Sequence, residues 1–313
     1  MGGGHWDSTV YSTYATNSGL VDKHGKATNK SAHEVFKSRE INQALNPYNV
    51  KIRESRDSAE HPMSNALALI LDVTGSMNVV AKYIAQQALP KLMVEIYKRQ
   101  PVVDPQVMFM GVDDIEDYIG GHLQVSQFES DIRIAEQLSL LWLENKGGGN
   151  DYESYSLPWY FLANHTSIDC FEKRAKKGYA ISIGDELPNP HLQLDQMERV
   201  LGYRPQSKDA NVLKTKSVLK KVQEKYHLIH IVAEEGSYAR SNKSQVQAAW
   251  TDLLGEGNVI MMPDYTKLAE IAISAIQVAE GQDAEEVAKT WEDKDTVKIV
   301  AKATKGLKRV VEV

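Results

Sequence analysis

The sequence predicts an α/β protein built on a doubly wound, mostly parallel sheet, with helices on both faces and one short antiparallel strand at an edge. Two observations carry this prediction. Nearly unbroken apolar runs recur along the chain, as in strands that are buried on both faces, and long amphipathic segments separate them. Strands that alternate with helices pair in parallel through right-handed crossovers, which place helices on both faces of the sheet.

Five segments have the composition of buried strands. The first begins at Asn65 and ends in the small polar residues of the sequence DVTGS, which starts at Asp72. The other four cover residues 106–114, 178–186, 228–235 and 258–264. A shorter segment, residues 122–129, alternates apolar with polar residues, which suits an exposed antiparallel edge strand.

The segments between these strands have the period of amphipathic helices. They cover residues 79–99, 132–144, 152–164, 213–226, 243–254 and 267–279. Pro90 interrupts the first of them. Because proline removes a backbone donor and clashes with the preceding turn, we expect a kink or a split in this helix.

We divide the chain into three parts. Residues 1–64 are a polar arm with one short helix, which starts at a capping box of Ser31 and Glu34 and stops at Pro47. Residues 65–281 are the α/β domain. Residues 282–313 are a charged tail or a hairpin at the edge of the domain.

Composition excludes several classes of function. A net charge of -6 and a pI near 5.9 argue against a broad electrostatic grip on nucleic acid or on an anionic membrane. Cys170 is the only cysteine, so the chain cannot form an internal disulfide or, alone, a thiolate zinc cluster. No secretory signal or membrane span is evident, so we expect a cytoplasmic protein, or a virion protein if the gene belongs to a phage.

The residues after the first strand are typical of a cation site. Asp72, Thr74 and Ser76 lie on alternate positions of a turn between strand and helix, where open α/β sheets bind ligands. A carboxylate and two hydroxyls are hard oxygen donors, which suit Mg²⁺ with retained waters. Asp185 follows a later buried strand and supplies a second carboxylate at the same edge. Taken alone, the motif is better explained as a helix cap by Asp72 or Thr74. Its combination with the matching Asp185 turn, the intervening glycine loop and the order of strand and helix favours the cation site.

A glycine loop lies between these two turns in the sequence. It starts at Gly147 and continues as GGGNDYES into a predicted helix, which allows it to cross the same crevice. Asn150, Asp151 and Glu153 carry its side-chain oxygens.

The DVTGSM segment resembles the metal-ion-dependent adhesion site of von Willebrand factor A domains, which begins with Asp-x-Ser/Thr-x-Ser, and the likeness covers about residues 65–280. The resemblance implies a Rossmann-like fold and a site of Asp72, Thr74, Ser76 and Asp185 that binds Mg²⁺, with Mn²⁺ or Ca²⁺ as alternatives. Gly149 stands where this family has a threonine ligand.

The glycine loop is similar to that of a bacterial and phage subset of these domains with GGG-N/D-x-x-E loops. In that subset the missing ligand is replaced directly or through water, and the candidates here are Asn150, Asp151 and Glu153. The phrases KIRESRDSAEHP and KKGYAISIGDE also resemble this subset.

The function that this resemblance implies is binding rather than catalysis. The cation would keep one coordination position for an Asp or Glu of a partner protein, and proteins of this kind often serve AAA+ ATPases or large assemblies. We expect no nucleic acid or membrane partner, and the oligomeric state stays open.

Two alternatives remain. One is a Mg²⁺-dependent phosphohydrolase of haloacid dehalogenase type, with Lys177 and Asp185 in its later motifs. That chemistry needs a second acid two positions after Asp72, where this chain has Thr74. The other alternative is a virion or assembly component whose arm and tail make the contacts.

Other polar and aromatic residues are better explained by structure. We interpret Asp113 and Asp114 as turn residues rather than outer ligands of a metal. An aromatic cluster at helical spacing is expected to pack in the core; its members are Tyr152, Tyr155, Trp159, Tyr160 and Phe161.

Overall fold

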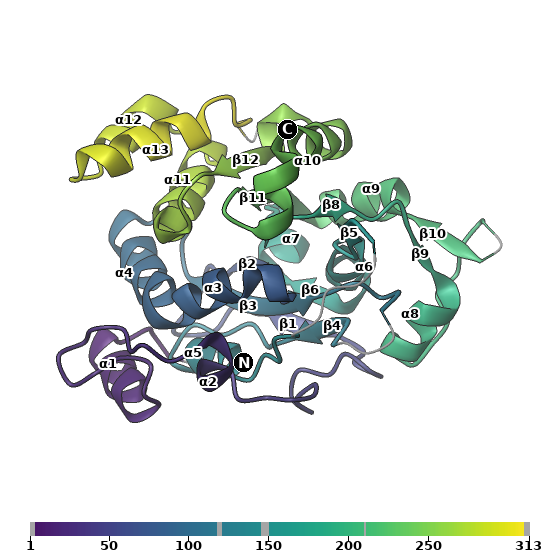
Figure 1. Ribbon diagram of the computed structural model, residues 1–313, viewed down its shortest axis with the longest axis horizontal. Coiled ribbons are helices and arrows are strands. Elements are labelled where there is room, and N and C mark those ends of the chain that lie inside the picture. Colours follow the sequence, from purple (N-terminus) through teal and green to yellow (C-terminus); the bar gives the residue numbers. More distant parts are fainter. Residues whose placement is uncertain (1–3, 118–120, 145–149, 210, 310–313) are drawn as a thin grey trace.

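The computed structural model describes residues 4–117, 121–144, 150–209 and 211–309. This part of the chain contains a six-stranded sheet of order β12-β11-β7-β2-β3-β4 (Figure 1). The strands are β2 (Asn65–Asp72), β3 (Pro105–Val112), β4 (Leu123–Val125), β7 (Gly178–Gly184), β11 (Tyr226–Ala233) and β12 (Val259–Met262). All neighbours in this sheet pair in parallel except β3 and β4. The predicted α/β class and mostly parallel sheet are confirmed.

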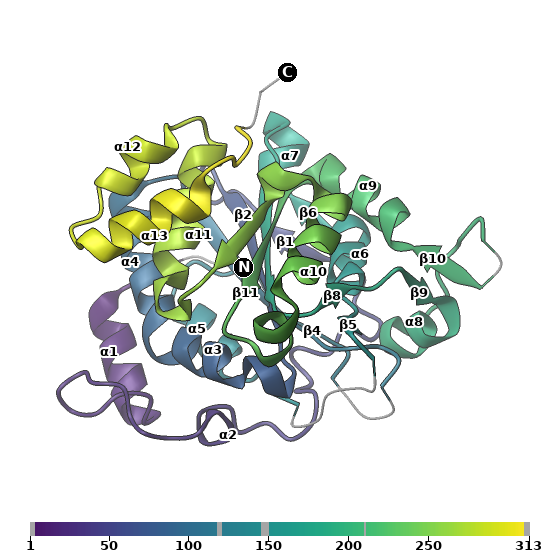
Figure 2. The same ribbon diagram turned by 45° about the horizontal axis from the view of Figure 1, so that its top comes forward.

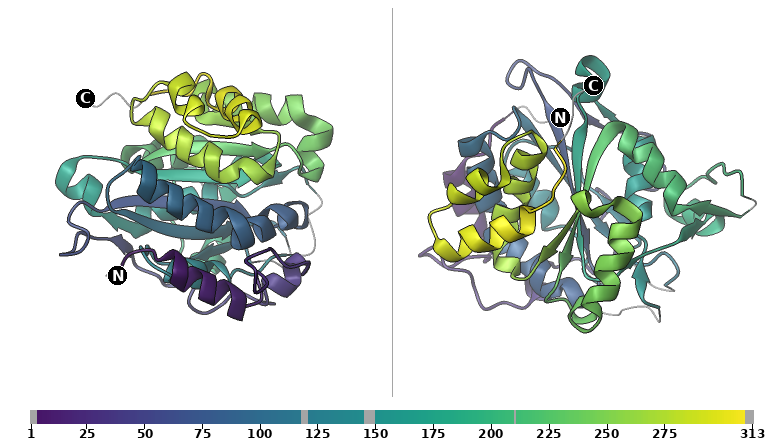
Figure 3. Two further views of the ribbon diagram at one scale, coloured as in Figure 1. Left: turned by 90° about the vertical axis from the view of Figure 1, so that its left-hand side faces the viewer. Right: turned by 90° about the horizontal axis from the view of Figure 1, so that it is seen from above.

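Helices cover both faces of the sheet because alternate residues of a strand point to opposite faces. Leu67, Leu69 and Leu71 of β2 belong to one core, and Ala66 and Ile70 belong to the other. The first core is closed by α3 (Asn78–Tyr83), α4 (Leu89–Arg99) and α11 (Leu268–Ala279). The second is closed by α6 (Ser156–His165), α9 (Thr215–Lys225) and α10 (Ser237–Leu254). Figure 3 shows the sheet between these two layers. The arrangement is Rossmann-like.

The short edge strand β4 lies where the sequence predicts it, but it is buried instead of exposed. The segment before the domain covers it. Val125 N donates to Leu45 O over 2.7 Å, and Arg53 Nη2 donates to Val125 O over 3.2 Å. The polar side chain of this strand, Gln124, also faces protein, since its Nε2 donates to Trp142 O over 2.9 Å.

Pro90 splits the first long helix, as predicted. A π-helical turn (Ile84–Ala88) separates α3 from α4. In π-helical pairing the amide of residue 90 would donate to the carbonyl of Ala85, and proline has no amide hydrogen. The Tyr11 hydroxyl donates to that carbonyl instead, over 2.9 Å in the buried core. A residue of the N-terminal segment thus fills a vacancy that Pro90 creates.

Residues 4–64 lie along the domain and pack against it (Figures 1 and 2). Tyr11 and Ala15 of α1 (Ser8–Asn17) are buried, and Gln86 Nε2 donates to Leu20 O over 2.9 Å. β1 (Arg53–Ser55) pairs in parallel with β6 (Thr166–Ile168). The short helix predicted before Pro47 is a single turn, α2 (Ala32–Val35), which starts at the predicted capping box.

The C-terminal segment forms two helices, so the predicted tail or hairpin is wrong for its described part. They are α12 (Ala284–Lys289) and α13 (Lys294–Thr304). Val300 and Ala303 are buried at helical spacing, and Trp291 Nε1 donates to Ser274 Oγ of α11 over 3.0 Å. The β-branched residues of this segment suggested a strand, but they pack as one face of a helix.

Several predicted helix boundaries also differ. The helix predicted over 132–144 is only α5 (Arg133–Leu138), and the one predicted from residue 152 starts four residues later, after β5 (Tyr152–Glu153). α10 starts at Ser237, and non-helical backbone at Asn242 marks the place just before its predicted start. Within the residues that the structure describes, none of the helices is long and apolar enough to cross a membrane.

We predict that Tyr11→Phe lowers the free energy of unfolding by about 1–3 kcal/mol, because it leaves the buried Ala85 carbonyl without a donor. Urea denaturation would measure the change. Tyr48→Phe is the matched control, since the Tyr48 side chain is 52% exposed. Equal midpoints for the two variants would contradict the role given to Tyr11.

Candidate functional site

The two aspartates predicted from the sequence meet at one edge of the sheet. Asp72 is the last residue of β2, and Asp185 directly follows β7. These strands are parallel neighbours, with Leu71 paired to Ile183, so their carboxyl ends lie side by side. Asp72 is 1% exposed and Asp185 is 0% exposed. The sheet therefore buries two acidic side chains close together.

Two hydroxyl groups connect the aspartates. Thr74 Oγ1 donates to Asp72 Oδ1 over 2.5 Å, and Ser76 Oγ donates to Asp185 Oδ1 over 2.7 Å. The two hydroxyl oxygens are 3.2 Å apart. Each hydroxyl has one proton, so when both protons point to carboxylates the oxygens face each other with lone pairs alone. A cation would satisfy this pair of acceptors.

A second turn in the same protein shows what an ordinary cap looks like. Asp264 Oδ1 accepts from Thr266 N over 2.8 Å and from Thr266 Oγ1 over 2.6 Å, as Asp72 does from Thr74. Asp264, however, is only partly buried. Asp72 is buried, and its Oδ2 accepts from Tyr155 Oη over 2.8 Å. The capping alternative explains Asp264 but leaves the surroundings of Asp72 unexplained.

Asp185 is held by the start of α10. Its Oδ2 accepts from Tyr238 N over 2.9 Å, at a helix end that carries partial positive charge. Burial raises the pKa of Asp185, and the bonds from Ser76 and the helix amides oppose that rise. Gly236 makes the close approach feasible, because a Cβ there would lie 2.3 Å from Asp185 Cβ.

Tyr155 is a site residue that sequence reasoning assigned to core packing alone. It is fully buried, and its ring lies edge-on to Trp250 and His230, with centroids 5.1 and 5.3 Å away. Its hydroxyl reaches Asp72 past Gly184, where any Cβ would lie 1.9 Å from the Tyr155 oxygen. Helical spacing could reveal that Tyr155 is buried but not that its hydroxyl meets Asp72.

Acidic side chains gather at this edge, and their ionised forms repel one another. Burial and then the charge of Asp185 raise the pKa of Asp72 to about 7. Burial and then Asp72 raise the pKa of Glu153 to about 12 and that of Glu186 to about 8. Among the described residues, the ion pairs leave these four carboxyl groups without a lysine or arginine partner. A bound cation would relieve the repulsion.

The three oxygen donors predicted in the glycine loop have different surroundings in the structure. Gly149 lies outside the described residues, as do residues 145–148. Asn150 donates to Asp114 Oδ2 and accepts from Tyr152 N over 3.3 Å, so its side chain is engaged away from Asp72. Asp151 is exposed. Glu153 is buried, and among the described residues its Oε2 finds no hydrogen-bond partner, so this oxygen is free to contribute to a site.

Asp113 and Asp114 do more than form a turn. Asp114 Oδ1 accepts from Glu116 N over 3.1 Å, as a turn residue would, and also from Ser154 Oγ over 3.0 Å. Asp113 is fully buried and pairs with His122 Nδ1 over 2.9 Å. The charges of both aspartates raise the pKa of Glu153, so this second acidic group lies within electrostatic reach of the first.

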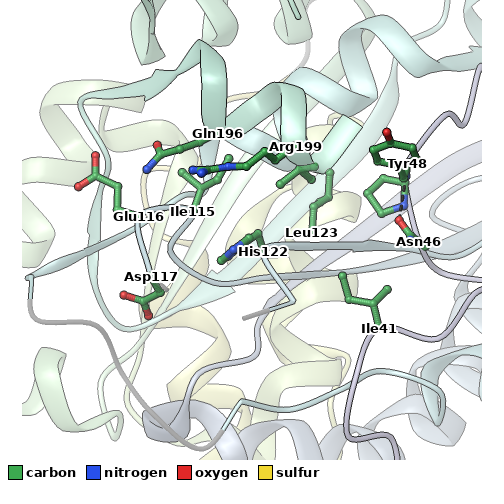
Figure 4. Close-up of a pocket in the computed structure, with 12 residues that line it drawn as sticks. Ile41, Asn46, Tyr48, Ile115, Glu116, Asp117, His122, Leu123, Gln196 and Arg199 are labelled. Carbon is green, nitrogen blue, oxygen red and sulfur yellow. Dashed lines mark hydrogen bonds between the residues drawn. The ribbon is translucent and has the colours of Figure 1, made fainter. Parts of the chain in front are cut away.

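A cavity of about 450 Å³ adjoins this second group (Figure 4). Glu116, Asp117 and His122 line it from the connection between β3 and β4, and Arg199 lines it from α8 (Leu194–Leu201). Burial, and then the charges of Asp114 and Asp113, raise the pKa of Asp117 to about 6. The acidic edge of the sheet therefore continues to the wall of a cavity.

The donor set fits a hard cation and not a transition metal with nitrogen or sulfur ligands. In the described part of the chain, no group of three or more His, Cys, Asp and Glu side chains is arranged to hold a metal ion. The proposed ligand set consists of the carboxylates of Asp72 and Asp185 and the hydroxyls of Thr74 and Ser76. Oxygen donors of this kind suit Mg²⁺, Mn²⁺ or Ca²⁺ with waters in the remaining positions.

The lysine of the phosphohydrolase alternative lies at the wrong edge of the sheet. Lys177 precedes β7, whereas Asp185 follows it, and the seven residues of the strand span roughly 20 Å. Lys177 Nζ donates to Gln223 O over 2.5 Å. The geometry therefore does not bring this lysine to Asp72.

No protein-family model matches the chain, and no curated protein matches it. The functional argument therefore depends on the residues at the site.

We predict that Asp72→Asn raises the free energy of unfolding in EDTA by about 1–2 kcal/mol, because it removes one of two buried like charges. The asparagine oxygen still accepts from Thr74. Asp264→Asn is the control, since it changes the same kind of turn where burial is only partial. Chemical denaturation of both variants measures the change. If Asp72→Asn loses as much stability as the control, Asp72 acts only as a helix cap.

Proposed function

We propose that this chain is a metal-dependent protein-binding module of the von Willebrand factor A type. Asp72, Thr74, Ser76 and Asp185 would hold Mg²⁺ at the carboxyl edge of the sheet and leave one position for an Asp or Glu of a partner protein. The observation that carries the proposal is the pair of hydroxyl oxygens, 3.2 Å apart, each of which also lies within hydrogen-bond distance of a buried carboxylate.

The residues around the site support this role by orienting the ligands. The Tyr155 hydroxyl donates to Oδ2 of Asp72, and the amide of Tyr238 at the start of α10 donates to Oδ2 of Asp185. The remaining oxygen of each aspartate is directed to a hydroxyl. When bound, the cation supplies an electrophilic centre, and two ligand charges leave it able to attract an external carboxylate.

The hydrogen bond from Tyr238 N to Asp185 would couple ligand exchange at the cation to the start of α10. The first turn of α10 is separated from the rest by the non-helical backbone of Asn242. A shift of Asp185 on partner binding would therefore move this turn without displacing the long helix behind it. For the partner we propose the class that the resemblance implies, which is an AAA+ ATPase or a large assembly.

Mg²⁺ at about one hundred times its Kd is expected to raise the free energy of unfolding by about 2.7 kcal/mol. The gain should vanish in Asp72→Asn and in Ser76→Ala and persist in Asp264→Asn. Thermal denaturation in Mg²⁺ and in EDTA measures it, with Mn²⁺ and Ca²⁺ in parallel. A protein that none of the three cations stabilises would overturn the site.

Partner capture from a host lysate tests the binding role. Proteins bound by the wild-type chain in Mg²⁺ should be lost in EDTA and lost with Asp72→Asn, because both remove the cation that bridges the two proteins. Asp264→Asn should retain them. Quantitative mass spectrometry reads the result, and retention under all conditions would mean that the cation is structural.

A further inference from the structure

The proposed cation site has an acidic rim, formed by Asp151, Glu186, Glu116 and Asp117, and this rim limits which partner can bind there. Asp151 is exposed, and Glu186, which directly follows Asp185, is partly exposed. Glu116 and Asp117 extend the acidic surface to the neighbouring cavity (Figure 4). An isolated acidic residue would meet like charge on approach. A carboxylate can dock on this edge when basic residues surround it and face the rim.

The chain itself has such a carboxylate on another face. A groove of about 890 Å³ lies against α6 and α9, and one acidic side chain lines it, that of Asp209. Five cationic side chains line the same groove: Arg204, Lys208, Lys214, Lys220 and Lys221. This local excess of positive charge contrasts with the net charge of -6 of the whole chain.

The segment that carries Asp209 projects from the body of the molecule and is anchored at its base. Figures 1 and 2 show residues 203–209 extending outward after α8, on the side of β10 (Val212–Lys214). Tyr203 Oη lies 2.6 Å from His165 Nε2 and 2.9 Å from Tyr160 Oη. At the other end of the segment, Ser207 Oγ donates to Val212 O over 2.7 Å.

The Asp209 carboxylate remains accessible. Its side chain is 43% exposed, and its ion pair with Lys214 spans 3.3 Å at the surface. Such an exposed pair contributes little, so Asp209 can give an oxygen to a cation while Lys214 stays beside it. This is the chemistry that the acidic rim requires of a partner.

We propose that the chain binds a second copy of itself head to tail, with Asp209 of one copy completing the coordination of the cation held by Asp72 and Asp185 of the next. The basic residues around Asp209 face the acidic rim of the neighbour. This inference rests on the proposed function. Because the two surfaces are different, the contact is heterologous, and each copy can use both surfaces to build a ring or a filament.

Complementation between two variants tests this contact. Asp72→Asn keeps the Asp209 segment but loses the cation, and Asp209→Asn keeps the cation but loses the carboxylate. In Mg²⁺ we expect sedimentation velocity to show assembly of the wild type and monomers of each variant. An equimolar mixture of the two variants should form heterodimers that stop at two copies.

The affinity of the wild-type contact should fall at least about thirtyfold with Asp209→Asn, since a buried charge pair is broken. Asp195→Asn, which changes an exposed aspartate of α8, should assemble like the wild type. Assembly that survives in EDTA or in Asp209→Asn would overturn the inference. So would a wild type that Mg²⁺ stabilises but that stays monomeric, while the proposed cation site would stand. A wild type that no cation stabilises would instead refute the proposed function itself.

Discussion

Two carboxylates buried side by side are the constraint around which this protein is built. Asp72 and Asp185 end neighbouring parallel strands, so the pairing of β2 with β7 forces them together. Each gives one oxygen to a hydroxyl of the DVTGS turn, and the other oxygen is fixed by Tyr155 or by the start of α10. Removing both charges from water is costly, and the proposed cation would offset that cost.

The core is shaped to keep these side chains in place. Gly184 leaves room for the Tyr155 hydroxyl, and Gly236 leaves room for Asp185. The helix that follows the DVTGS turn is supported from outside the domain, because Tyr11 bonds to the carbonyl that Pro90 leaves without a donor. The N-terminal segment therefore stabilises the helix that follows this turn, in addition to covering the sheet edge.

Net charge conceals how unevenly this surface is charged. The carboxyl edge of the sheet gathers acidic side chains that raise one another's pKa values, whereas the groove beside α9 gathers lysines. A net charge of -6 argues against a broad grip on anions, but a local groove can still be basic. Complementary surfaces on one chain give a physical basis for contacts between copies.

The sequence by itself determined the α/β class, the parallel order of strands and helices, and the edge at which Asp72, Thr74, Ser76 and Asp185 lie. These follow from hydrophobic period and from the rule that parallel strands end at one edge. Only the tertiary structure decided that the Tyr155 hydroxyl reaches this site, that Glu153 is buried within electrostatic reach of Asp72, that Asn150 bonds to Asp114, and that the C-terminal segment is helical. These outcomes depend on contacts between residues far apart in the chain, and local periodicity carries no information about which side chains the crossovers bring together.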